Sequence, residues 1–171
     1  KTYADEKDNN MTVFADKFDS GVPRDSLSAP FRLHTSNIYI SDLSFVLSDN
    51  NQKEPVLLSL IHGGGSLSDF KINGPNVYTN IRGLYFVDNR KLQVTNLTTD
   101  FSYTTKNMIF ENTVLETTSS KLNAQIKFSY DREDLQYFND KVKVEAKFSD
   151  SKFSVSDLSK LYNELSGNSV L

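Results

Sequence analysis

The sequence contains no cysteine and no tryptophan, and its 171 residues include only seven glycines and four prolines. Without cysteine the chain forms no disulfide and no thiolate metal site, which is neutral on its compartment. No apolar run approaches the roughly 18 residues of a membrane span, and the polar residues 1–10 lack a signal-peptide core. The net charge of −3 leaves no basic face for a phosphate backbone, so nucleic acid is not an expected partner.

Apolar and polar residues alternate over most of the chain. In residues 121–129 the apolar positions are Leu122, Ala124, Ile126 and Phe128. Residues 142–148 repeat the pattern with Val142, Val144, Ala146 and Phe148. Because successive side chains of a strand point to opposite faces, this alternation predicts strands with one apolar and one polar face.

The alternation slips by one residue at several places. Such a slip moves the apolar side chains to the other face unless the backbone bulges or bends. A tetrapeptide of apolar, Ser or Thr, Asp or Asn, and apolar residues marks slips at Ile40–Leu43, Leu67–Phe70 and Val94–Leu97, which begin 27 residues apart. We interpret this spacing as a repeating strand, bend and return, with coincidence as the alternative.

We therefore expect a mostly β fold, with long bent antiparallel strands in a curled sheet around an open apolar groove, and one short C-terminal helix. The chain, 1–171, is interpreted as a single fragment of a longer repetitive β-sheet protein. An irregular or hairpin lead-in covers 1–30, the curled sheet covers 31–155, and the helix covers 156–166 with Ser156 as its N-cap. Within the sheet, Pro55–Ile61 reads as a short strand that is followed by a glycine-bulged turn at His62–Gly65.

Three motifs suggest chemistry, but each has a simpler interpretation. The His62–Gly65 glycines are similar to the oxyanion-hole motif of lipases, yet no Gly-x-Ser-x-Gly elbow accompanies them. Asp131, Glu133 and Asp134 lack the spacing of a calcium loop and are typical of a solvated acidic turn. His34 and His62 have no metal-ligand spacing. We expect no enzymatic activity, no cofactor and no metal.

Several segments together resemble the TamB branch of the AsmA-like family, in the form found in Bacteroidota. The residues that carry the resemblance are Leu92–Leu97, Asp100–Tyr103, Leu115–Leu122 and Ile126–Tyr130, with Leu67–Val77 and Phe153–Leu165 as further similar segments. The resemblance covers most of the chain from about Pro30 to Leu165 and rests on a repeated pattern more than on one diagnostic motif.

The resemblance implies a function in lipid transport. Proteins of this family are long, anchored by a helix in the inner membrane of Gram-negative bacteria, and extend through the periplasm as a curled sheet with a hydrophobic groove. They are implicated in carrying phospholipid towards the outer membrane and in outer-membrane protein assembly with an Omp85-class barrel. This chain lacks the anchor and the partner-binding ends, so the resemblance implies an internal segment whose membrane and barrel contacts lie elsewhere.

Such a groove requires a continuous apolar surface and no catalytic residue. We expect the following side chains to line it: Leu92, Val94, Phe101, Leu122, Ile126, Phe128, Val142, Val144 and Phe148. The competing prediction is a closed β-sandwich that binds glycan or protein, like an adhesin. That class predicts two opposed sheets, a sealed core, and exposed aromatic side chains such as Tyr85, Tyr103 or Tyr137 at its site.

Overall fold

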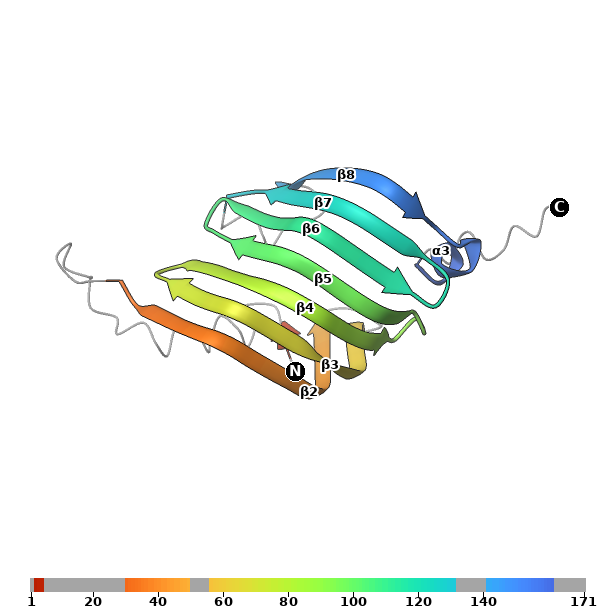
Figure 1. The fold of residues 1–171 in the computed structure, drawn as a ribbon, viewed down its shortest axis with the longest axis horizontal. Coiled ribbons are helices and arrows are strands. Elements are labelled where there is room, and N and C mark those ends of the chain that lie inside the picture. The colour runs from red at the N-terminus through yellow and green to blue at the C-terminus, as the bar shows by residue number, and fades with distance from the viewer. Residues whose placement is uncertain (1, 5–29, 50–55, 132–140, 162–171) are drawn as a thin grey trace.

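The computed structural model describes residues 2–4, 30–49, 56–131 and 141–161. These residues form one curled sheet and a short helix (Figure 1). The strands are β1 (Thr2–Ala4), β2 (Arg32–Asp49), β3 (Val56–Asn73), β4 (Asn76–Asp88), β5 (Gln93–Tyr103), β6 (Asn107–Thr117), β7 (Lys121–Ser129) and β8 (Lys143–Lys152), and the helix is α3 (Val155–Leu161). The prediction of a mostly β fold with one short C-terminal helix is confirmed.

The strands lie side by side in the order of the sequence. From β2 to β8 each strand is antiparallel to the next, whereas β1 runs parallel to the end of β2 (Figure 1). No described strand pairs with the far edge of β8, and the sheet is curled without closing into a barrel. The described residues contain no second sheet facing the first, so the arrangement expected of a closed sandwich is not found in them.

The strands bend where extra residues interrupt the pairing. On β2, β4, β6 and β8 the residues at these shifts with positive φ are Asp42 (52°), Gly83 (60°), Asn112 (49°) and Asp150 (41°). We call these four residues the bend residues. Glycine adopts this conformation freely and Asn or Asp tolerates it better than other residues, so the chemistry of these positions suits a bend. The predicted bends at Ser41–Asp42 and Ser68–Asp69 are confirmed, with φ of 52° at Asp69 as well.

The predicted repeat of 27 residues does not correspond to a repeat in space. Ile40–Leu43 lies on β2, Leu67–Phe70 on β3 and Val94–Leu97 on β5, so one step of 27 residues advances by one strand and the next by two strands. Each tetrapeptide does coincide with a shift of register or a positive φ. The tetrapeptide is therefore a local bend signal, and its equal spacing in the sequence is not a structural period.

Strand β3 is longer than the sequence suggests. Pro55–Ile61 and the residues after Gly65 were expected to form two strands separated by a glycine turn, but Val56–Asn73 is one strand of 18 residues. His62 has φ of 53° and the register with β4 shifts on both sides of Gly64, so the glycines form bulges inside the strand. Glycine marks either a turn or a bulge, and only the pairing of the flanking residues distinguishes them.

Helix α3 begins two residues earlier than its predicted cap implies. Ser156 was expected to be the N-cap, but the Ser154 Oγ accepts a hydrogen bond from the Ser156 amide at 3.2 Å, and the Ser154 carbonyl accepts the first helical bonds. The N-cap is therefore Ser154. Within the predicted lead-in over 1–30, only β1 and Pro30 are described. The rest of the lead-in and the end of the predicted helix after residue 161 lie outside the described residues.

Candidate functional site

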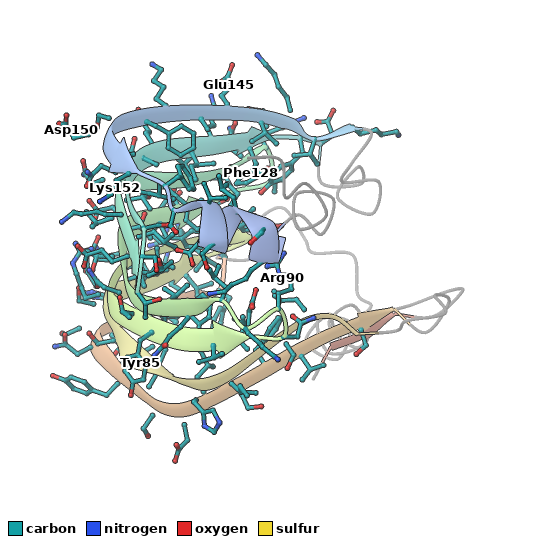
Figure 2. The ribbon with its side chains drawn as sticks, turned by 90° about the vertical axis from the view of Figure 1, so that its right-hand side faces the viewer. Tyr85, Arg90, Phe128, Glu145, Asp150 and Lys152 are labelled. Carbon is teal, nitrogen blue, oxygen red and sulfur yellow. The ribbon has the colours of Figure 1, made fainter. Side chains whose placement is uncertain are left out.

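One face of the sheet carries a continuous row of apolar side chains. Residues directly opposite each other on neighbouring strands share a face. Following these pairs from β2 to β8 gives an unbroken set, which we call the apolar row: Leu33, Ile72, Val77, Tyr103, Met108, Phe128 and Val144. Figure 2 shows Phe128 on the concave side of the sheet, whereas Glu145, Asp150 and Lys152 point away from it. The apolar row therefore crosses the concave face.

A second row lies two residues further along the same strands. It consists of Phe101, Phe110, Ile126 and Ala146, which are paired in turn from β5 to β8. The rings of Phe101 and Phe110 lie 5.0 Å apart between centroids, and those of Phe110 and Phe128 lie 6.1 Å apart. These are ordinary packing distances for aromatic side chains, so the two rows merge into one aromatic surface over β5 to β7.

This surface is covered only in part. Among the apolar side chains whose exposure the structure describes, Leu92, Val94 and Tyr130 are buried, and the others are half-buried or exposed. Val144 and Phe148 are 52% and 56% exposed at the edge of the sheet. Monomeric proteins seldom expose large contiguous apolar patches without a use for them. The concave face thus has the character of a binding surface more than of a sealed core.

The structure places six of the nine predicted lining residues on one face of the sheet. Phe101, Leu122, Ile126, Phe128, Val144 and Phe148 belong to one face of β5, β7 and β8, since their pairs and their two-residue spacing share that face. Val142 is half-buried and lies immediately before β8. The rings of Phe148 and Phe153 pack edge to face at 6.4 Å, which adds an aromatic residue beyond the end of the strand.

The other two predicted residues lie deeper. Leu92 is 8% exposed and Val94 is 2% exposed, so their side chains contribute to packing and offer little surface to a ligand. Asp88 anchors the turn before them, because its carboxylate accepts hydrogen bonds from the backbone amides of Leu92 and Arg90 at 2.8 and 2.9 Å. The alternation that singled out Leu92 begins in this turn, one residue before β5.

A polar network supports the bend beneath the aromatic surface. Thr99 is fully buried, and its hydroxyl bonds to the carbonyl of Glu111 at 2.9 Å and to the Thr113 hydroxyl at 2.8 Å. The carboxylate of Asp100 accepts hydrogen bonds from Asn112 at 2.9 Å and from Arg82 at 2.7 Å. These bonds hold the pKa of Asp100 below its ordinary value. The network joins β4, β5 and β6 where Gly83 and Asn112 bend.

Helix α3 is attached to the turn between β6 and β7 by a buried carboxylate. Asp157 is 3% exposed and accepts hydrogen bonds from Thr117 at 2.5 Å and from Ser120 at 2.6 Å. Burial alone would raise the pKa of Asp157, but these hydroxyls and Lys160 outweigh it and lower the pKa. Figure 2 shows α3 on the concave side of the curled sheet, so the helix occupies part of that face.

Tyr103 and Tyr130 form one end of the aromatic surface. Their ring centroids lie 6.2 Å apart, and the Tyr130 hydroxyl donates to the Thr104 carbonyl at 3.1 Å. Burial, with a smaller contribution from Tyr103, raises the pKa of Tyr130 to about 12. Tyr103 therefore lies on the concave face, within the apolar row, and is not an isolated aromatic side chain of the kind that a sandwich-type binding site would present.

Two hollows are lined by residues outside the apolar row. A hollow of about 360 Å³ is lined by His62, Tyr85, Val87, Gln93 and Thr95 among others, and Tyr85 is 48% exposed there. A larger hollow of about 630 Å³ beside the bend of β6 to β8 has a mixed lining that includes Glu111, Asn123 and Lys147. Within the described ranges no group of three His, Cys, Asp or Glu side chains is placed to hold a metal ion. Tyr137 lies outside the described residues.

Several residues of the concave face were not predicted. Phe110, Met108 and Tyr103 complete the aromatic surface, and the alternation of Met108 with Phe110 was a signal that could have included them. Leu33, Ile72 and Val77 join the apolar row only through the register of β2 to β4. Contacts between neighbouring strands set this register, so no pattern within one strand predicts it.

Comparisons of the chain with protein-family models, with curated proteins and with solved structures found no match. In the described part of the chain, no helix has the length and apolar character needed to cross a membrane. The candidate site is therefore defined by its own geometry: a curled sheet with an apolar concave face that is open along much of its surface.

Proposed function

We propose that the concave face binds the acyl chains of phospholipid, and that the chain is an internal segment of a bridge-like lipid-transport protein of the TamB type. The observation that carries the proposal is the apolar row, which continues without interruption over seven strands. A surface that extends in this way suits a long flexible hydrocarbon better than a compact ligand. The proposal includes a periplasmic location and leaves contacts with the membranes and an Omp85-class barrel to other parts of the protein.

The energetics favour an acyl chain on such a surface. Burying one methylene group contributes about 0.8 kcal/mol, so a chain of about fourteen carbons gains on the order of 10 kcal/mol if it is fully covered. An open face covers only part of the acyl chain, so the gain in free energy is smaller and binding stays reversible. Movement along the surface needs no catalytic residue, because neighbouring positions of the row differ little in their apolar character. The charged outer face, with Glu111, Lys127 and Lys147, keeps the opposite side in water.

The proposal is tested with a pair of adjacent substitutions on β7. Ile126 lies in the second row on the concave face, whereas Gln125 is exposed on the outer face. We expect Ile126→Arg to lower the recovery of lipid at least about tenfold after incubation with vesicles of phosphatidylethanolamine and phosphatidylglycerol, because a charge on the surface forfeits the apolar contact. Gln125→Arg adds the same charge one residue away and is expected to leave recovery unchanged. Mass spectrometry of the repurified protein provides the measurement.

A photo-crosslinker supplies an independent readout. With benzoylphenylalanine in place of Phe110 we expect covalent lipid adducts, while the same group in place of Ile109, the neighbouring residue that faces outwards, is expected to give few. Circular dichroism checks that each variant retains the sheet. Equal lipid recovery from both arginine variants, or equal crosslinking from the two positions, would contradict the proposal. Binding of oligosaccharide that depends on Tyr85 would favour the sandwich-type binding function instead.

A further inference from the structure

Among the elements whose burial the structure describes, β8 at the edge of the sheet is the most exposed. All ten residues of β8 are exposed, and β7 is the only described strand that pairs with it. An edge strand presents unpaired backbone N–H and C=O groups, which makes it a template for another strand. Val144 and Phe148 add apolar side chains to this edge, with 52% and 56% exposure.

We propose that β8 pairs with β8 of a second copy of this chain, antiparallel and around a two-fold axis at Ala146. The interface would be isologous, since the same strand serves both copies, and it closes after two copies. The inference concerns the assembly of residues 1–171 and does not depend on what the concave face binds. A second copy would occupy the edge where a longer sheet would add its next strand, so pairing of two copies and continuation of the sheet past β8 exclude each other.

The alternation of β8 restricts the possible registers. A continuous sheet keeps its apolar face only if residues of the same face lie opposite each other. The concave-face residues of β8 are Val144, Ala146 and Phe148, and the outer-face residues include Glu145 and Lys147. For two antiparallel copies, the permitted registers are therefore those in which one residue of β8 faces itself.

Charge and the length of the paired strands together select one of these registers. With Ala146 at the axis, Glu145 of each copy lies opposite Lys147 of the other, so two oppositely charged pairs form. With Glu145 at the axis, Glu145 would face itself and Lys143 would face Lys147. With Lys147 at the axis, the two lysines would face each other. With Val144 at the axis, Glu145 would lie opposite Lys143, but only residues 143–145 of β8 would be paired, against residues 143–149 with Ala146 at the axis. Like charges directly opposite are destabilising and opposite charges are stabilising, so the register centred on Ala146 is favoured.

The concave faces agree with the same register. It places Val144 of one copy opposite Phe148 of the other, and Ala146 opposite Ala146, so small and large apolar residues alternate across the junction. Within one copy Glu145 already pairs with Lys143 at 2.7 Å, which holds the carboxylate on the outer face beside the edge. The apolar surface would then run from one copy into the next, and each β8 edge would be covered.

Charge reversal tests the electrostatic part of the proposal. We expect the parent chain to dimerise in sedimentation equilibrium, and Glu145→Lys or Lys147→Glu to raise the dimer dissociation constant about tenfold, because the two-fold axis converts two attractive pairs into two repulsive ones. The double variant Glu145→Lys with Lys147→Glu restores both pairs and is expected to restore dimerisation. Lys91→Glu, in the turn between β4 and β5, is the control and is expected to have no effect.

Cysteine pairs test the register, since the chain has no cysteine of its own. Ala146→Cys is expected to form a disulfide-linked dimer on oxidation, because the two copies of this residue lie opposite each other at about 5 Å between Cβ atoms. Val144→Cys is expected to crosslink with Phe148→Cys in a mixture and not with itself, since its own copies lie about 13 Å apart along the strands. A monomer at every concentration, a dimer insensitive to both charge reversals, or crosslinking of Val144→Cys alone would each overturn the proposal.

Discussion

Two regions of the sheet bend by different means. In β3 and β4 the bend relies on missing side chains, because Gly63, Gly64 and Gly65 pack directly against the neighbouring strands. In β5 and β6 it relies on added hydrogen bonds, with Thr99 bonded on one side and Asp100 on the other. The difference shows that a strand is bent either by removing steric bulk or by satisfying the polar groups that a bulge exposes. The two regions should therefore respond to different substitutions.

The largest effect is expected at Gly65. A Cβ atom at this position would lie 2.7 Å from the Leu84 Cα, so Gly65→Ala forces two backbones apart in addition to the cost of a positive φ, which both glycines share. We expect a loss of about 3 kcal/mol in the free energy of unfolding, from chemical denaturation followed by circular dichroism. Gly83→Ala is the control: its Cβ meets nothing within 4 Å, so only the cost of φ at 60°, about 1 kcal/mol, remains. Equal losses at the two glycines would refute the steric account of the first region.

A smaller effect is expected at Thr99. Thr99→Val keeps the shape of the side chain but leaves the Glu111 carbonyl without this donor and the Thr113 hydroxyl without its partner. We expect a loss of about 1.5 kcal/mol. Thr95→Val, on the outer face of the same strand, removes an exposed hydrogen bond and is expected to cost less than about 0.5 kcal/mol. Adding Thr113→Val to Thr99→Val should cost less than the sum of the single changes, since both polar partners are then removed.

The smallest effect on stability is expected where Asp157 attaches α3 to the turn between β6 and β7. Neither bend depends on this attachment. The lowered pKa of Asp157 means that its ionised form is stabilised in the folded state, so this stabilisation is present above pH about 4 and is lost as the pH falls through the folded pKa. Hydrogen exchange of the Asp157 and Leu158 amides should therefore accelerate below pH 4. Asp157→Asn should give fast exchange already at pH 7, whereas Asp150→Asn, at an exposed carboxylate, should not. Protection that is independent of pH in the parent chain would contradict this role.

Much of the fold follows from local patterns, and the remainder does not. The alternation at Leu122, Ile126 and Phe128 predicted one-sided strands, because side-chain direction in a strand depends only on sequence position. The bend at Ser41–Asp42 was predictable for the same reason, as a slip of phase with a residue that tolerates positive φ. Curling into a single open sheet was also anticipated, from long strands that alternate and bend.

The features that were missed depend on contacts between distant residues. The glycines of β3 were interpreted as a turn because their flanking partners, Leu43 on β2 and Tyr85 on β4, are not visible from the local sequence. Ser154 caps α3 because the Ser120 hydroxyl holds its amide at 3.0 Å, a contact between residues 34 positions apart. The apolar row required the register of seven strands, which hydrophobic pattern and turn geometry set together.

The positions of the bend residues have a consequence for how such a sheet grows. Asp42, Gly83, Asn112 and Asp150 lie on β2, β4, β6 and β8, which run in the same direction, so each successive pair of strands carries one of these bend residues, while β3 carries further bends at His62 and Asp69. Adding or deleting a whole hairpin would keep the next bend on a strand of the same direction and preserve the concave face. Adding a single strand would reverse the direction of every strand after it. Duplication of hairpins thus lengthens the sheet while leaving its curvature unchanged.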